Sequence, residues 1–239
     1  MARASTTTAA THRRPRAAAK KSAQSSETKP NLGELAYSKL EELIVTCQIP
    51  PGSVHLANGL AERIGIGRTP VRDAINRLAR EGMVRVVPRV GVVVAEVNVE
   101  DQLKLLELRR EIERFLVRCA AKRANASERE AFSVLQTSMK EALKRKDIVL
   151  FARADYEFND LVRVASRNEL AADTMQPLQS RARRYWYLHH RGQLSERGVQ
   201  CHIDIAGAIA RGDPDAAAAA SDSLMDYIQE YTRAALPTF

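Results

Sequence analysis

Residues 58–82 constrain the fold of this chain more than any other segment, because they predict two short helices joined by a tight turn. In the second helix the apolar residues recur at i, i+3, i+4 and i+7, which places them on one buried face: Val71, Ala74, Ile75 and Leu78. Pro70 fits this helix only in its first turn, since a proline further in would remove a backbone hydrogen bond. The second helix therefore begins near Arg68 or Thr69.

Polar residues occupy the tip and the outer side of this second helix. Arg68, Thr69 and Arg72 cluster at the N-terminal tip, and Asn76 lies on the outer side. In helix-turn-helix proteins this tip contacts base edges, and an arginine there can donate two hydrogen bonds to guanine. A surface helix with a solvated charged side is the alternative interpretation.

The flanking segments favour the DNA-binding interpretation. Residues 36–44 form another amphipathic pattern, and the Ile-Pro-Pro-Gly run at 49–52 ends it. Residues 83–87 and 91–95 are two β-rich runs on either side of Pro88-Arg89-Val90. Three helices followed by a β-hairpin make a winged helix. Arg89 would then lie at the wing tip, where a cation can reach backbone phosphate or the minor groove.

This part of the chain, about residues 33–97, resembles the GntR family of bacterial transcription regulators. The resemblance implies sequence-specific binding to double-stranded DNA. At Gly67 the family usually has Ser or Thr, so a phosphate-contacting hydroxyl and helix cap are lost here. The residues that carry the resemblance are Pro50-Pro51-Gly52, Leu60-Ala61-Glu62, the run from Arg68 to Ala74, Leu78, Glu81-Gly82-Met83-Val84 and Gly91.

The basic character of the chain is concentrated at its start. The formal net charge is +8, and residues 1–30 hold seven Lys and Arg against one acid. This segment has almost no large apolar residue, so we expect a disordered tail. It is interpreted as a flexible basic arm that attracts phosphate, an inert extension, or a transit peptide. Three widely separated cysteines indicate reduced thiols and a cytoplasmic protein.

From Asn98 onward the pattern is helical throughout, which predicts an all-α bundle of about six helices after the winged helix. No apolar run approaches the roughly 18 residues of a membrane span. We therefore predict three parts: a basic tail over 1–30, a winged helix over 31–97, and an all-α effector-binding and dimerisation domain over 98–239. The expected helices cover about 99–124, 127–146, 148–166, 170–187, 195–211 and 213–235.

The C-terminal part resembles the FCD type of ligand-binding domain, found in the FadR-like branch of the same family. Many relatives bind a divalent metal there through one Asp and three His. Here Asp155 and His202 match two ligand positions, but Asn159 and Leu224 replace the other two histidines. The resemblance therefore leaves open an incomplete zinc or nickel site, or a buried hydrogen-bonded pair of Asp155 and His202. Residues 155 and 159 share one helical face.

Arg109 lies three residues after Leu106 and three before Ile112, on the apolar side of its predicted helix. A charged side chain there needs a partner. Glu113, one turn later, is one candidate, and the carboxylate of an anionic effector is the other. Arg109, Asp155, Asn159 and His202 are therefore the expected effector-binding residues.

The sequence thus predicts a homodimeric transcription regulator, a repressor in most members of the resembled family, that responds to a small organic acid. Two alternatives remain at this point: a ligand-independent DNA binder whose effector pocket has decayed, and a metal-dependent enzyme. The enzyme is disfavoured because the sequence has no complete ligand set, no nucleophile–base pair and no cofactor loop. No certain cofactor and no membrane partner are expected.

Overall fold

The computed structural model describes residues 1–2, 31–189 and 193–234. The chain divides into two units, Met1–Pro30 and Asn31–Phe239. The predicted basic tail lies almost wholly outside the described residues, so the following account concerns the second unit.

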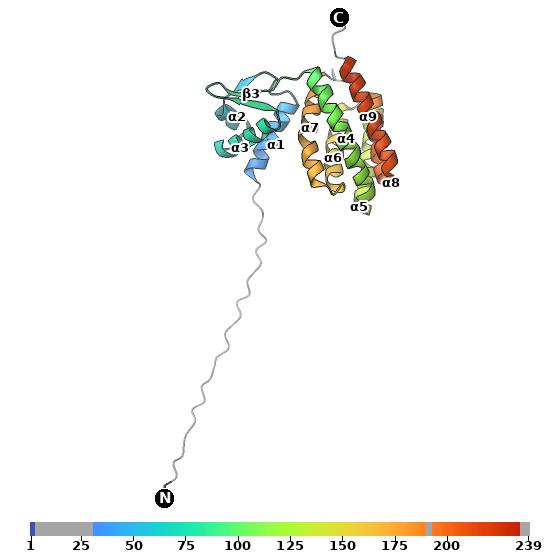
Figure 1. The fold of residues 1–239 in the computed structure, drawn as a ribbon, viewed down its shortest axis with the longest axis horizontal. Coiled ribbons are helices and arrows are strands. Elements are labelled where there is room, and N and C mark those ends of the chain that lie inside the picture. The colour runs from blue at the N-terminus through green and yellow to red at the C-terminus, as the bar shows by residue number, and fades with distance from the viewer. Residues whose placement is uncertain (3–30, 190–192, 235–239) are drawn as a thin grey trace. The chain divides into compact units, whose positions relative to one another are not determined.

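The first part of this unit is a winged helix (Figure 1). Its sheet has the antiparallel order β1-β3-β2, and Val54 of β1 pairs with Val93 of β3. The predicted hairpin of β2 and β3 is confirmed, whereas β1 was not predicted because two residues give no periodic pattern. The elements are α1 Leu32–Val45, β1 Val54–His55, α2 Ala57–Ile64, α3 Arg68–Arg80, β2 Val84–Val87 and β3 Gly91–Val94.

The periodicity of α3 accounts for its packing. Its predicted start at Arg68 is confirmed, and its four predicted apolar residues are all at most 3% exposed. These residues join the buried face of α1, which includes Leu40 and Ile44, in one hydrophobic core. Burying side chains of this size is the main stabilising contribution to so small a domain. The same packing fixes which side of α3 remains in solvent.

The rest of the described chain forms an all-α bundle, so the predicted fold class is confirmed (Figure 1). Side-chain caps define several helix starts. Asn98 accepts a hydrogen bond from the amide of Asp101, and Asn125 forms a reciprocal capping box with Glu128. The helices are α4 Val99–Arg123, α5 Ala126–Arg145, α6 Ile148–Ala165, α7 Glu169–His189, α8 Glu196–Arg211 and α9 Pro214–Ala234.

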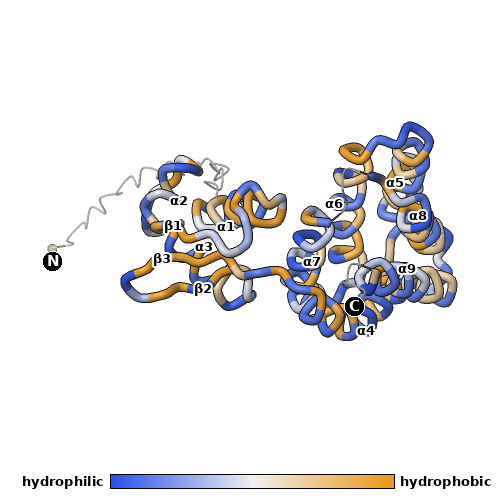
Figure 2. The backbone as a smooth tube through the Cα atoms, turned by 90° about the horizontal axis from the view of Figure 1, so that it is seen from above, coloured by the Kyte–Doolittle hydropathy of each residue, from blue (hydrophilic) through white to orange (hydrophobic). Residues whose placement is uncertain are grey.

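The bundle is held together by one hydrophobic core to which all six helices contribute. Helix α4 packs along α9, and α8 packs against both α5 and α9. Apolar and polar segments alternate along these helices in Figure 2, as expected for helices with one buried face. Among the described helices none is long and apolar enough to cross a membrane.

Candidate DNA-binding surface and helical-domain cavity

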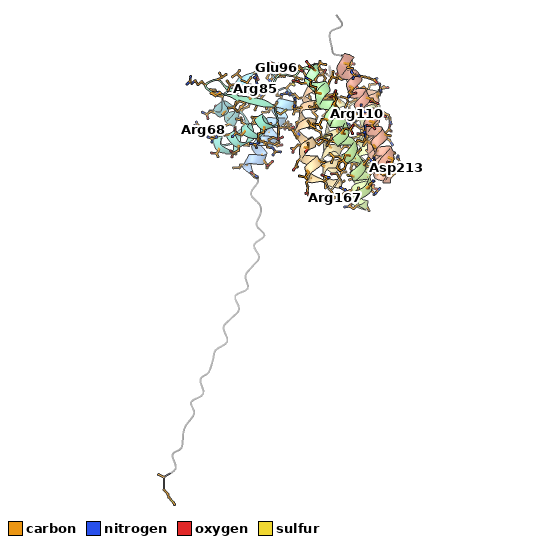
Figure 3. The ribbon with its side chains drawn as sticks, viewed as in Figure 1. Arg68, Arg85, Glu96, Arg110, Arg167 and Asp213 are labelled. Carbon is orange, nitrogen blue, oxygen red and sulfur yellow. The ribbon has the colours of Figure 1, made fainter. Side chains whose placement is uncertain are left out.

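The tip of α3 carries the residues that the sequence predicts for base recognition. Arg68, Thr69, Arg72 and Asn76 are exposed, because the buried face of the helix points the other way. Figure 3 labels Arg68 at the start of the helix. Arg68 and Arg72 are one turn apart, so their side chains emerge from the same side of the helix.

The arginines of α3 fall into two kinds. Arg68 and Arg72 make no hydrogen bond or ion pair with any residue that the structure describes. Arg77, by contrast, binds Glu81 and Glu34, each at 3.0 Å, and its guanidinium lies 3.7 Å from the centre of the Tyr37 ring. Arg77 therefore stabilises the domain, whereas the two tip arginines are available to a partner.

The wing adds two further exposed cations. Arg89 lies in the turn between β2 and β3, where its backbone has a positive φ of 64°. Arg85 is exposed on β2 and is labelled in Figure 3. Sequence reasoning missed Arg85, although its place in the β-rich run before the wing turn could have indicated it. Arg68, Arg72, Arg85 and Arg89 therefore belong to the two elements that a winged helix presents to DNA.

Glycines shape both elements. Gly67 is the N-cap of α3 and provides no side-chain hydrogen bond, so the predicted loss of a cap is confirmed. Gly91 begins β3 with φ of 126°, and a Cβ atom there would lie 2.6 Å from the backbone oxygen of His55. Only glycine allows β3 to approach β1 this closely.

The helical domain contains a cavity of about 130 Å³, lined by residues of α4, α6, α7, α8 and α9. The four predicted effector residues, Arg109, Asp155, Asn159 and His202, all line this cavity. The structure therefore brings together side chains from three helices that the sequence could only associate by resemblance. Six aromatic residues also line it: Phe151, Tyr185, Trp186, Tyr187, Tyr227 and Tyr231.

A chain of hydrogen bonds crosses the polar end of the cavity. His202 Nδ1 lies 2.8 Å from the Gly198 carbonyl oxygen, and His202 Nε2 lies 3.2 Å from Asp155 Oδ1. The Asn159 amide nitrogen donates to the same Asp155 oxygen at 3.0 Å, and Gln179 donates to the Asn159 oxygen at 2.7 Å. Both ring nitrogens of His202 thus face oxygen atoms, an arrangement that suits the doubly protonated imidazolium beside a carboxylate.

The electrostatics of the pair agree with this protonation state. Burial alone would raise the pKa of Asp155, but the hydrogen bond and charge of His202, with the charges of Arg109 and Arg183, lower it. Burial alone would lower the pKa of His202, but its bond to Asp155 outweighs burial and raises it. The pair is therefore an ion pair.

These residues do not fit a divalent metal. A metal ion would have to displace the proton that His202 directs at Asp155, and Asn159 presents its amide N–H₂ to the carboxylate instead of an oxygen to a metal. Leu224 is 1% exposed and provides an apolar wall at the fourth position. Within the described residues no group of three or more His, Cys, Asp or Glu could hold a metal ion. Asp155 and His202 instead form a hydrogen-bonded pair whose side chains are 18% and 12% exposed.

Arg109 is 8% exposed and uses one edge of its guanidinium for Glu113, with Nε 2.7 Å from Glu113 Oε2. The terminal Nη atoms have no hydrogen-bond partner among the described residues, and Arg109 lines the cavity. Both sequence expectations are therefore compatible: Glu113 balances the charge, while the Nη edge is left for a ligand.

Arg183 links the cavity wall to the first helix of the winged helix. It lines the cavity, and its Nη2 donates to Glu41 Oε1 of α1 at 2.7 Å. The Ser180 hydroxyl, one turn earlier on α7, donates to the same oxygen at 2.6 Å. No sequence pattern indicates these contacts, because they join residues about 140 positions apart.

The fold and these surfaces define a class: a winged-helix DNA-binding protein with an all-α ligand-binding domain. Residues 32–94 match the family described as bacterial regulatory proteins, gntR family, and residues 104–227, more than half of the chain, match the FCD domain. The chain belongs to the gntR family of transcription regulators, with an FCD domain. It is thus a DNA-binding transcription regulator, and its domains and relatives indicate regulation rather than catalysis.

One relative is similar in sequence over most of this chain, and two solved structures are similar in fold. The HTH-type transcriptional repressor RspR of Escherichia coli K12 is 26% identical over 211 residues, which cover 88% of this chain and 92% of RspR. Among solved structures, Escherichia coli McbR/YncC has a TM-score of 0.74 at 18% identity, over 86% of this chain and 99% of that one. A GntR regulator from Rhodococcus has a TM-score of 0.65 at 17% identity, over 86% of this chain and 99% of its own.

Proposed function

We propose that this regulator is a repressor that binds a short palindromic operator as a homodimer in the cytoplasm and responds to a small organic acid. One observation carries the DNA-binding part of the proposal. Arg68, Arg72, Arg85 and Arg89 are exposed on the α3 tip and the wing, and all four side chains lack a partner in the described part of the chain. Thr69 and Asn76 complete the proposed contact surface.

The dimer is supported by the requirements of specificity. One winged helix reads few base pairs, whereas a two-fold pair of readers doubles the site and requires a palindrome. We assign dimerisation and effector binding to residues 98–239 and DNA binding to residues 31–97. Residues 1–30, with their seven cations, would add sequence-independent attraction to phosphate.

The effector part rests on Arg109. Arg109 lines the cavity with its Nη atoms unbonded to any described residue, whereas the other two cations of the described lining have anionic partners: His202 has Asp155, and Arg183 has Glu41. A carboxylate can bind two Nη hydrogens at once, without displacing Glu113. A ligand close to Arg183 would also change the contact with Glu41, which gives the cavity a route to the winged helix.

A genome-wide footprint of the protein on its own chromosome tests the DNA-binding part. We expect a short palindromic motif, and a dimer in sedimentation at micromolar concentration without DNA. The purified protein is then titrated on the footprinted operator with a panel of organic acids, of which at least one should change the operator affinity. Footprints without a palindrome and a monomer in solution would contradict the dimer. Operator binding that no acid alters would favour a ligand-independent DNA binder.

A further inference from the structure

The wall of the effector cavity is rich in aromatic side chains, although its charged residues suggest a polar ligand. The chain has twelve aromatic residues, and six of them line this one cavity. They come from three helices: Phe151 from α6, Tyr185, Trp186 and Tyr187 from α7, and Tyr227 and Tyr231 from α9. So strong a concentration is more than the bundle core requires, since that core is otherwise mainly aliphatic.

The apolar side of the cavity continues beyond these rings. Leu224 stands where related domains are expected to place a metal-binding histidine, and it is buried against the cavity. Val199 and Ile228 also line the cavity. The residue changes that remove a metal site therefore also extend the apolar surface that a ligand would contact.

Size restricts the ligand further. The cavity of about 130 Å³ is close to the roughly 150 Å³ of an apolar cavity that accepts benzene in another protein. Aromatic rings pack favourably edge-to-face, and Phe151 already contacts the His202 ring in this way, with 5.4 Å between ring centres. The available space therefore suits a single ring with small substituents.

The polar end of the cavity, where Arg109 lies, would orient the ligand. Arg109 is more than nine-tenths buried, and its Nη atoms have no hydrogen-bond partner among the described residues. These two donor groups remain accessible in a side chain that lines the cavity, so a ligand that supplies acceptors can bind them there. An uncharged ligand would form weaker hydrogen bonds with these donors than a carboxylate does.

We infer that the ligand of this cavity is a compact aromatic carboxylate, with its carboxylate on the Nη edge of Arg109 and its ring among the six aromatic side chains. This inference rests on the proposed effector site and adds the chemical class of the ligand. It requires no metal.

Tryptophan fluorescence gives a direct assay, because Trp186 is the single tryptophan of the chain and lines the cavity. The full-length protein is titrated with benzoate and its hydroxylated derivatives. Cyclohexanecarboxylate, which keeps the charge without the aromatic ring, and benzamide, which keeps the ring without the charge, serve as matched ligands. Thermal shift provides a second readout. We expect the best aromatic acid to bind at least about tenfold more tightly than either matched ligand.

Variants assign the two ends of the ligand. Arg109→Gln alone would leave Glu113 as an unpaired buried charge, so the double variant R109Q/E113Q is used, which removes both charges together. It should weaken aromatic-acid binding about tenfold or more, whereas R110Q should not change it. Arg110 follows Arg109 on α4 but binds Asp226 instead of lining the cavity (Figure 3). Phe151→Leu should weaken benzoate roughly two- to tenfold and leave cyclohexanecarboxylate unchanged.

The inference is overturned if no aromatic acid of the panel binds in the millimolar range, or if either matched ligand binds as tightly as the aromatic acid. It is also overturned if R109Q/E113Q retains full affinity while its melting curve shows a folded protein. Failure of the proposed function gives a different result: aromatic acids bind the cavity but leave operator affinity unchanged. An aliphatic acid that releases the operator would support the proposed function and contradict this inference.

Discussion

Arg72 and Arg77 show how the same residue type serves two purposes on one helix. Arg77 binds two carboxylates and lies over a tyrosine ring, so its side chain links α3 to α1 within the winged helix. Arg72 is exposed, because it lies on the side of α3 opposite to the buried residues. A substitution at Arg72 should therefore change DNA binding without changing stability.

We expect Arg72→Ala to lower affinity for the specific operator by about 1–3 kcal/mol, because a good arginine–base contact contributes this much discrimination. Arg68→Ala should have a similar effect. The measurement is operator binding by fluorescence anisotropy, with circular dichroism to show that the fold is retained. Arg153→Ala, on an exposed side of α6, is the control and should bind like the unchanged protein. If the affinity of R72A stays within twofold, the assignment fails.

Asn159 and Leu224 carry a second prediction at this scale. In the present arrangement both ring nitrogens of His202 face oxygen atoms and Leu224 has no ligand atom to offer, so dialysis against EDTA should leave the melting temperature unchanged. The double variant N159H/L224H places histidines at both altered positions, and it should bind zinc where the parent does not. The readout is metal content by atomic absorption after equal exposure to zinc. Near-stoichiometric zinc in the parent protein would contradict this account of the site.

At the scale of elements, the short strand β1 depends on the close approach that Gly91 permits. A Cβ atom at Gly91 would lie 2.6 Å from the His55 oxygen, at a φ that other residues rarely adopt. We expect Gly91→Ala to destabilise the winged helix by about 1–3 kcal/mol.

Gly59 provides a matched control, because it lies in α2, where an added Cβ would contact nothing within 4 Å. Gly59→Ala should stabilise by about 0.5–1 kcal/mol, since alanine has the higher helix propensity. Thermal and urea unfolding of both variants measure the difference. Equal stability of the two variants would show that the β1–β3 contact contributes nothing.

The sequence predicted the helices well because their determinants are local. Periodicity placed the buried face of α3, and Asn98 gave the start of α4 through its cap. It missed β1, whose two residues are ordered only by pairing with β3. In the cavity it identified Arg109, Asp155, Asn159 and His202, but not Gln179 or the aromatic residues of α6 and α9. Those residues become neighbours only when α6, α7 and α9 pack, and no local pattern records that packing.

At the scale of the whole molecule, Glu41 connects the winged helix to the wall of the helical-domain cavity. Its side chain accepts hydrogen bonds from Ser180 and Arg183, and Arg183 also lines the cavity. Coupling between two ligands of one protein is typically about 1–3 kcal/mol and requires contacts that differ between two states. We expect the shared carboxylate of Glu41 to be such a contact.

We expect Glu41→Gln to reduce by more than half the change in operator affinity that a bound effector causes. Operator affinity without effector, and effector affinity without DNA, should each change much less. Glu42→Gln is the neighbouring control, because Glu42 makes no ion pair with a described residue. The four affinities of a thermodynamic cycle give the coupling directly. An E41Q protein with unchanged coupling would show that the signal travels by another route.

The bare start of α3 has one more consequence. With Gly67 as N-cap, the first turn of this helix has backbone N–H groups that no capping side chain satisfies. In solution these groups are hydrated, and the first turn frays more readily than the rest of the helix. An approaching phosphate would satisfy them and order the turn that carries Arg68. Binding to DNA would thus order the first turn of α3. We expect the amide protons of this turn to exchange fast in the free protein and slowly on the operator.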